Sequence, residues 1–381
     1  MKLLSFLCVM FFFSGCSNVE YRPDLTIKKP LVPLVKKVIL AEKSWSKKVG
    51  LGNGHLDAIL LPSGNGAQII CADTCGLVVA FNRNSGEFLW KTNLNVSISS
   101  GPSTAEGNVL VGTSKGQVIA LKEKDGTIVW ETNLSDVILA KPMIRDGDVY
   151  VHTFDGHLIS LNLKNGQKLW RFDSNMPPIA LRRSSSPAIT QDLVLSGFAN
   201  GQLVAINRVD GSVAWEQDVS SSIGDSDLSR MVDICADPIV YTDTVYVVAY
   251  QGNLSAFDLQ MGHLIWEKKI SSYAGFAIFG DVIYVSAVSG DVWAINRHTG
   301  STLWIQCDLQ GRKLSKPVIQ KNFVVIGDED GFLHWIHRIN GCIQGRFKVG
   351  KKGIGSPPIV QGDTLYTYLN NGNLVKLVTK K

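Results

Sequence analysis

The sequence GNVLVGTSKGQVIALKEKDGTIVW, from Gly107 to Trp130, is followed by GDVYVHTFDGHLISLNLKNGQKLW, from Gly147 to Trp170. Both copies contain three short runs rich in valine, isoleucine and leucine, a composition that favours β-strands. The runs are separated by glycine beside Asp, Asn or Ser, residues that suit the positive φ of tight turns. The pattern therefore predicts a repeated unit of strand, turn, strand, turn and strand.

The tryptophan that ends each unit recurs along most of the chain. It stands at Trp90, Trp130, Trp170, Trp215, Trp266 and Trp304, at intervals of 40, 40, 45, 51 and 38 residues. A glycine precedes each of these tryptophans by four residues. Units of about 40 residues with four strands are typical of β-propeller blades. Each indole is expected to pack between neighbouring blades and to bury roughly 150–250 Å².

Two further units are incomplete. The unit from Phe323 to Gly345 has Gly345 where a tryptophan is expected, and the unit from Pro358 to Leu377 stops before its last strand. Near the other end of the chain, Trp45 lies in a strand-like segment that has no repeat before it. We therefore expect an all-β, eight-bladed propeller of four-stranded antiparallel blades over residues 41–381, with the ring closed by the N-terminal strand. Seven or nine blades are alternatives.

Other repeat folds fit less well. WD40 repeats would place aspartate after the tryptophan, whereas Lys, Glu, Arg or Ile follows here. A parallel β-helix has shorter repeats, and helical solenoids need an apolar period of 3.6 residues.

The N-terminus has the features of an export signal. Lys2 precedes an apolar run, Leu3–Phe13, that is too short to cross about 30 Å of hydrocarbon. Small residues then precede Cys16, as in the lipobox of bacterial lipoproteins, which this segment resembles. The resemblance implies that residues 1–15 are a signal peptide, that Cys16 carries the lipid and that Ser17, which is not aspartate, directs the protein to the outer membrane. An ordinary secretory signal is the alternative.

Residues 16–40 contain three prolines and no helical or strand period, which predicts an extended tether. At roughly 3.3 Å per residue, about 25 residues could reach ~80 Å. The formal net charge of +5 is too small, and too evenly spread, to indicate nucleic-acid binding. Five cysteines follow position 16, so at least one thiol has no partner within the chain, and a Cys71–Cys75 disulfide is left open.

The recurring segment from Ala120 to Trp130 resembles the tryptophan-docking motif of the pyrroloquinoline-quinone propeller superfamily. With the lipobox and eight blades, the chain is similar to the BamB lipoproteins of the outer-membrane β-barrel assembly machinery. This resemblance implies a non-enzymatic scaffold on the periplasmic side of the outer membrane, anchored there by lipid. Its partners would be BamA, which forms the barrel, other subunits of the complex and, as a further possibility, unfolded outer-membrane proteins. No nucleic acid is expected.

The resemblance is strongest in two inter-blade connections, at Ala180–Pro187 and at Asp227–Pro238. These are also the places where the repeat interval lengthens to 45 and 51 residues, so two long loops should project near one another. An apolar residue with charged neighbours is how interface hot spots are usually built. The residues expected to bind the partner are Ile179, Leu181, Arg182, Arg183, Arg230 and Asp233. Cys235 stands where the family often has a second aspartate.

The sequence offers little for catalysis. The acidic run Asp328–Gly331 lacks the full spacing of an EF-hand. The histidines form no HExxH motif, and His152 and His157 are interpreted as solvated turn residues. We expect no catalytic residue, cofactor or metal. A quinone- or metal-dependent periplasmic oxidoreductase and a structural surface lipoprotein remain the alternatives.

Overall fold

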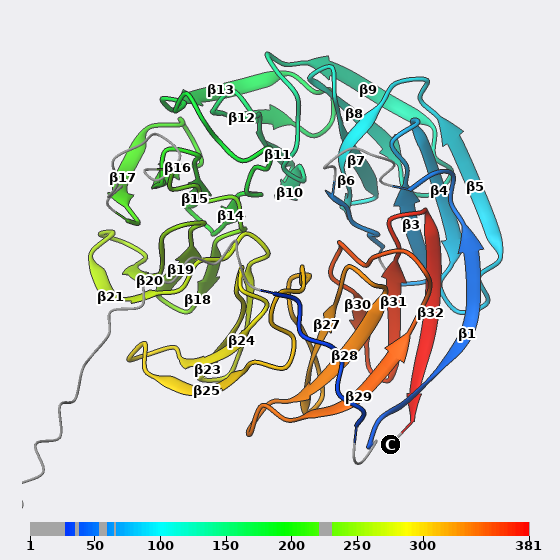
Figure 1. The fold of residues 1–381 in the computed structure, drawn as a ribbon. Helices are drawn as coiled ribbons and strands as arrows, with labels where there is room; N and C mark the ends of the chain where they lie inside the picture. Colours follow the sequence, from blue (N-terminus) through cyan, green and yellow to red (C-terminus); the bar gives the residue numbers. More distant parts are fainter. Residues whose placement is uncertain (1–26, 35–37, 53–58, 65, 221–230, 381) are drawn as a thin grey trace, which may run out of the picture.

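The computed structural model describes residues 27–34, 38–52, 59–64, 66–220 and 231–380. These residues form eight β-sheets arranged around a central axis (Figure 1). Within these ranges, no helix has the length and apolarity needed to cross a membrane. The eight-bladed all-β propeller expected from the repeats is confirmed.

The strands follow one another blade by blade around the ring. The first four blades contain β2 (Ile59–Leu60), β3 (Gln68–Ala72), β4 (Leu77–Asn82), β5 (Phe88–Asn93); β6 (Ile98–Ala105), β7 (Asn108–Thr113), β8 (Gln117–Lys122), β9 (Ile128–Asn133); β10 (Met143–Arg145), β11 (Asp148–His152), β12 (His157–Asn162), β13 (Lys168–Asp173); and β14 (Ala188–Ile189), β15 (Leu193–Gly197), β16 (Gln202–Asn207), β17 (Val213–Asp218).

The last four contain β18 (Ile239–Tyr241), β19 (Thr244–Val248), β20 (Asn253–Asp258), β21 (Leu264–Lys269); β22 (Phe276–Phe279), β23 (Val282–Ser286), β24 (Val292–Asn296), β25 (Thr302–Gln306); β26 (Val318–Gln320), β27 (Phe323–Gly327), β28 (Phe332–His337), β29 (Ile343–Lys348); and β30 (Ile359–Gln361), β31 (Thr364–Tyr368), β32 (Asn373–Lys380), β1 (Leu40–Lys48).

Six of these sheets in the described chain have four strands, and the first two blades differ. β2 pairs in parallel with β6 of the second blade, which leaves three strands in the first sheet and gives five to the second. Ser63, a few residues later, bridges back to Ile70 of β3. The chain between β2 and β3 therefore contacts both blades and takes the place of a regular innermost strand.

Burial explains the composition of the strands. The two middle strands of a blade are covered by neighbouring blades on both faces, so β7 and β8 are buried at four or more successive positions. The outermost strand β9 alternates instead, with Trp130 as its buried residue. Continuous apolar runs are expected where both faces of a strand are covered, and alternation where one face meets water.

The recurring tryptophans join successive blades, as predicted. Seven of them donate a hydrogen bond from Nε1 to a backbone carbonyl in the next blade, at 2.7–3.1 Å; the acceptors are Asn84, Glu123, Leu163, Arg208, Leu259, Arg297 and Arg338. The glycine that recurs four residues before each tryptophan has a steric reason, which Gly300 illustrates. It has a φ of +68°, and a Cβ there would lie 2.8 Å from the ring of Trp266. Only glycine allows both the turn and the close approach of the indole.

The seventh blade holds its neighbour differently. A Cβ on Gly345 would lie 2.9 Å from the Cβ of Ile39, so no indole fits at this position. The fully buried Trp335, on the adjacent strand β28, donates instead to the side-chain oxygen of Gln320 at 2.8 Å. The amide nitrogen of Gln320 in turn donates to the carbonyl of Gly362 in the eighth blade, at 3.1 Å.

The ring closes where the first and last strands meet. β1 pairs antiparallel with β32 from Leu40 opposite Lys380 to Lys48 opposite Asn373. Trp45 of β1 then docks on the first blade through the carbonyl of Asn84. Figure 1 shows β1 beside β32, at the outside of the last blade. The predicted completion of the last blade by the N-terminal strand is confirmed.

Residues 27–34, which the sequence assigns to the tether, lie against the ring (Figure 1). The Lys29 amide donates to the carbonyl of Gln310 at 3.0 Å, and Arg346 donates to the carbonyl of Val32 at 2.8 Å. The ammonium of Lys28 lies 2.8 Å from Glu329. We call residues 27–34 the docked segment, and its contacts shorten the length of chain available as a free tether.

The cysteines Cys71 and Cys75, whose pairing the sequence leaves open, are both free. Cys71 is buried in β3, whereas Cys75 is exposed in the turn that follows. Burial raises the pKa of the Cys71 thiol, which keeps it in the unreactive protonated form.

Candidate functional site: paired loops at the channel mouth

The two long connections expected to bind a partner lie against each other. One joins β13 to β14 and the other joins β17 to β18. The backbone amide of Leu181 donates to Oδ2 of Asp233 at 2.9 Å, and the amide of Ser186 donates to Oδ1 of Asp237 at 2.8 Å. We call residues 176–186 and 231–237 the paired loops; two carboxylates of the second loop fix the backbone of the first.

The first loop presents an apolar and cationic surface. Ile179 is 41% exposed, Arg182 is exposed and Leu181 is half-buried. The guanidinium of Arg183 lies 4.8 Å above the ring of Tyr273, a cation–π contact that holds this side chain in place. Ile179, Leu181 and Arg182 are thus available to a partner. Arg230, the remaining cation expected here, lies outside the described residues.

Asp233, which the sequence predicts to contact the partner, lies buried behind the first loop. Its side chain is only 1% exposed, and its backbone exchanges hydrogen bonds with that of Tyr250. Burial raises the pKa of Asp233 to about 7, against the opposing effect of the Leu181 amide. Because this carboxylate accepts the Leu181 amide, we interpret Asp233 as a residue that positions the loop.

This burial predicts a pH-dependent effect of Asp233→Asn. Between the ordinary aspartate pKa near 4 and the folded value of about 7, the unfolded chain loses the proton while the folded chain keeps it. The free energy of unfolding of the parent protein therefore falls as the pH rises through this window. The free energy of unfolding of Asp233→Asn, taken relative to that of the parent, should therefore rise by up to about 4 kcal/mol from pH 4 to pH 8. Thermal unfolding of both proteins across this range checks the prediction, and a difference that does not change with pH would contradict it.

A buried histidine contacts the backbone of the first loop. His152 is buried, and its Nδ1 lies 3.1 Å from the carbonyl of Ser185. Burial lowers the pKa of His152 to about 4, so the ring is neutral at pH 7 and can donate to that carbonyl. The expectation that His152 is solvated is wrong, because the adjacent blade and its Phe198 ring cover this end of β11. His157 is half-buried, and its ring nitrogens lie 3.0 Å from Asp155 and 2.7 Å from Asp173.

The carboxylates of the acidic run Asp328–Gly331 contact other side chains of this protein. Asp328 is fully buried and lies 3.1 Å from Arg312 and 3.0 Å from His334. Asp330 pairs with Lys28 of the docked segment. Within the described ranges, no group of three or more His, Cys, Asp or Glu side chains is arranged to hold a metal ion.

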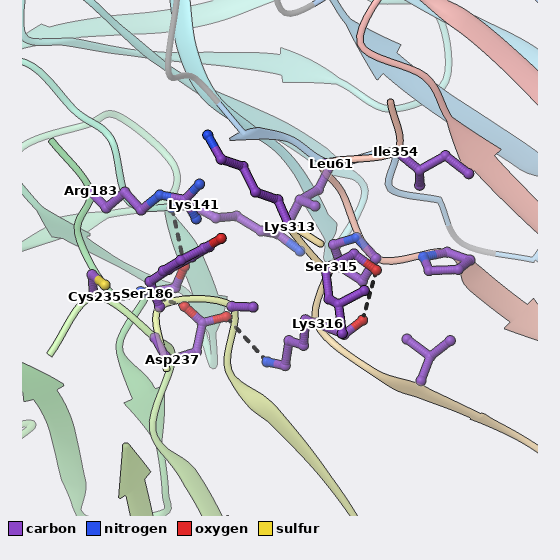
Figure 2. Close-up of a pocket in the computed structure, with 18 of the residues that line it drawn as sticks. Leu61, Lys141, Arg183, Ser186, Cys235, Asp237, Lys313, Ser315, Lys316 and Ile354 are labelled. Atoms are coloured by element: carbon purple, nitrogen blue, oxygen red, sulfur yellow. Dashed lines mark hydrogen bonds and ion pairs between the residues drawn. The ribbon is translucent and has the colours of Figure 1, made fainter. Parts of the chain in front are cut away.

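The paired loops form part of the rim of the central channel. A cavity of about 530 Å³ opens there, and Arg182 is among the residues that line it. Figure 2 shows Arg183 and Asp237 at its wall. Lysines from other blades also line it, and sequence reasoning missed them. A sequence pattern could have located them, because Lys141, Asp237 and Lys316 each precede a proline that leads into the innermost strand of a blade. Residues at this repeat position face the channel.

The chain is similar in sequence to a family of known proteins. The family model described as outer membrane protein assembly factor BamB matches residues 75–306. A curated relative from Pseudomonas aeruginosa with that name is 44% identical over 365 residues, which cover 95% of this chain and 94% of the relative. The chain belongs to the BamB family. A BamB from Escherichia coli K12 is 31% identical, with 96% of this chain and 95% of the relative covered.

Solved structures agree with this assignment. The crystal structure of BamB from Moraxella catarrhalis superimposes with a TM-score of 0.81 and 26% identity, covering 89% of this chain and all of that one. A europium-containing methanol dehydrogenase gives a TM-score of 0.72 at 12% identity, which shows a shared fold alone. A BamB protein and a dehydrogenase thus share this fold, so function must be argued from the site.

Proposed function

We propose that this protein is a non-enzymatic scaffold of outer-membrane protein assembly, in which the paired loops bind BamA, the barrel-forming subunit. The names of its relatives support the assembly role. On this proposal the propeller acts as a rigid frame, since blades that brace one another can present variable loops without changing their own structure. Contacts with other subunits and with unfolded outer-membrane proteins would extend the same role.

The observation that carries the proposal is the pre-ordered state of the first loop. Asp233 and Asp237 hold its backbone, while Ile179, Leu181 and Arg182 stay accessible. A loop that is already ordered loses little conformational entropy when it binds, which improves affinity for a given contact area. An apolar centre beside a cation suits a partner surface with an apolar pocket and neighbouring carboxylates.

Copurification tests the proposal directly. The tagged full-length protein, extracted from its own membranes in mild detergent, is expected to bring BamA with it in a stable complex. Mass spectrometry of the eluate identifies the partners, and a tagged unrelated outer-membrane lipoprotein is the control. An eluate without BamA under conditions that keep other assembly subunits together would contradict the proposal.

We further propose that Cys16, which lies outside the described residues, carries the lipid that holds the protein at the outer membrane, facing the periplasm. Acyl chains contribute about 0.8 kcal/mol for each buried CH₂, and stable anchoring needs more than one chain. Cys16→Ala should leave the protein unprocessed or release it to the soluble fraction. Membrane fractionation and intact mass measure this, and an unchanged mature mass with unchanged fractionation would contradict it.

A further inference from the structure

The mouth of the central channel has an excess of positive charge that the paired loops do not explain. Of the described residues lining its cavity of about 530 Å³, five are cationic, namely Lys141, Arg182, Arg183, Lys313 and Lys316, and two are acidic, namely Asp237 and Glu329. A cavity of this size matches the pockets that bind small molecules. The lining therefore combines a suitable volume with a net charge of one sign.

The two acids offset this excess only in part, because each also has a partner outside the set of channel lysines. Glu329 lies 2.8 Å from Lys28 of the docked segment. Asp237 accepts the Ser186 amide at 2.8 Å and lies 3.5 Å from Lys316, the longer and weaker of its contacts. Among the described residues, neither Lys141 nor Lys313 forms an ion pair. In the described part of the chain, these two ammonium groups thus have no direct ion-pair partner, and Lys141 has only the electrostatic influence of Asp237.

The cations come from opposite sides of the ring. Lys141 precedes β10 of the third blade, Arg183 precedes β14 of the fourth, and Lys313 and Lys316 precede β26 of the seventh. Figure 2 shows Lys141, Arg183 and Lys316 arising from separate segments around the cavity, with Lys316 directed at Asp237. Burial lowers the pKa of Lys141; Asp237 opposes this shift and Lys316 adds to it, so these charges influence one another across the cavity.

We propose that the channel mouth binds a small multivalent anion that carries carboxylate or phosphate groups, held between Lys141 on one side and Lys313 and Lys316 on the other. Hydrogen bonds between charged partners are the strongest that such a site can make. A cleft lined by one sign of charge also concentrates ions of the opposite sign. The bound anion would replace repulsion among the lysines with attraction and would connect the third and seventh blades across the channel.

Titration calorimetry of the purified mature protein tests this site, with citrate and pyrophosphate as probes at constant ionic strength. We expect saturable binding of at least one probe at a single site, in the presence of excess chloride. Tighter binding of citrate would assign the site to carboxylates, and tighter binding of pyrophosphate would assign it to phosphates. The absence of saturable binding of both probes at millimolar concentration would overturn the proposal.

Variants distinguish the channel from the rest of the cationic surface. Lys141→Gln and Lys313→Gln should each weaken binding by about tenfold or more, because each removes one of the converging charges. Lys164→Gln, on an exposed turn of the third blade, is the matched control and should bind as the parent does. Circular dichroism and thermal unfolding establish that all three variants fold. Equal affinities for the parent and both channel variants would overturn the site. These variants leave Ile179 and Leu181 in place, so the result does not depend on partner binding.

Discussion

Removal of residues 38–48 is expected to lower the melting temperature by about 10 °C or more, or to prevent folding. The deletion removes β1, which pairs with β32 along its whole length, and leaves the edge of the last blade unpaired. It also removes Trp45, whose indole docks on the first blade at Asn84. Trp45 is partly buried, so its loss alone should cost less than the roughly 3–5 kcal/mol of a fully buried tryptophan, and the lost strand pairing adds to that cost. In a protein of this size, 1 kcal/mol corresponds to roughly 2 °C.

The control for this deletion keeps the strand and changes only its exposed face. Lys43 is exposed on β1, so Lys43→Ser should leave the melting temperature within about 1 °C of the parent value. The melting temperature of Trp45→Ala should lie between those of the deletion and Lys43→Ser, because this variant loses the interblade contact and keeps the strand pairing. Differential scanning calorimetry measures all three. If the deletion melts at the same temperature as Lys43→Ser, the ring is not closed by β1.

Substitutions in the first of the paired loops are expected to have the largest effect on partner binding. Arg182→Glu reverses an exposed charge without touching the core. Leu181→Asp places a carboxylate where an apolar side chain is expected to enter the partner's surface. Removal of a hot-spot residue costs 2 kcal/mol or more, so each variant should weaken BamA binding by about 30-fold.

Two exposed positions elsewhere on the ring supply matched controls. Val209 is 94% exposed in a turn of the fourth blade, so Val209→Asp introduces the same acid as Leu181→Asp at a position away from the paired loops. Lys164→Glu reverses an exposed charge in the third blade, as Arg182→Glu does at the loops. Both controls should bind as the parent does. Leu181 lies close to the buried Asp233 in space, so the Leu181→Asp protein must also be shown to unfold cooperatively.

The blades could be predicted from the sequence because each repeats the same local chemistry. A glycine four residues before a tryptophan satisfies a turn and an interblade contact together, and six repetitions make this pattern hard to miss. Ring closure by Trp45 followed from the strand missing at the other end of the chain. The contact between the seventh and eighth blades could not be predicted, because it depends on Gln320 and Trp335, which occur in no repeated motif.

The candidate site was predictable in its location and less so in its detail. Two unusually long connections indicated the paired loops, but their lengths do not show which side chains turn inward. Asp233 is a charged residue in a loop, and only the fold reveals that Leu181 and the blade beneath it bury this carboxylate. Likewise, Lys141 and Lys316 are 175 residues apart, and the ring alone brings them to one cavity.

The most direct test of the proposed function is the affinity of the purified mature protein for the periplasmic domain of BamA. Titration calorimetry measures this for the parent, for Leu181→Asp and Arg182→Glu, and for the two control variants. The account predicts one-to-one binding that the loop substitutions weaken by about 30-fold and the controls leave unchanged. Folded loop variants that bind the BamA domain with the affinity of the parent would show that the paired loops are not the binding surface.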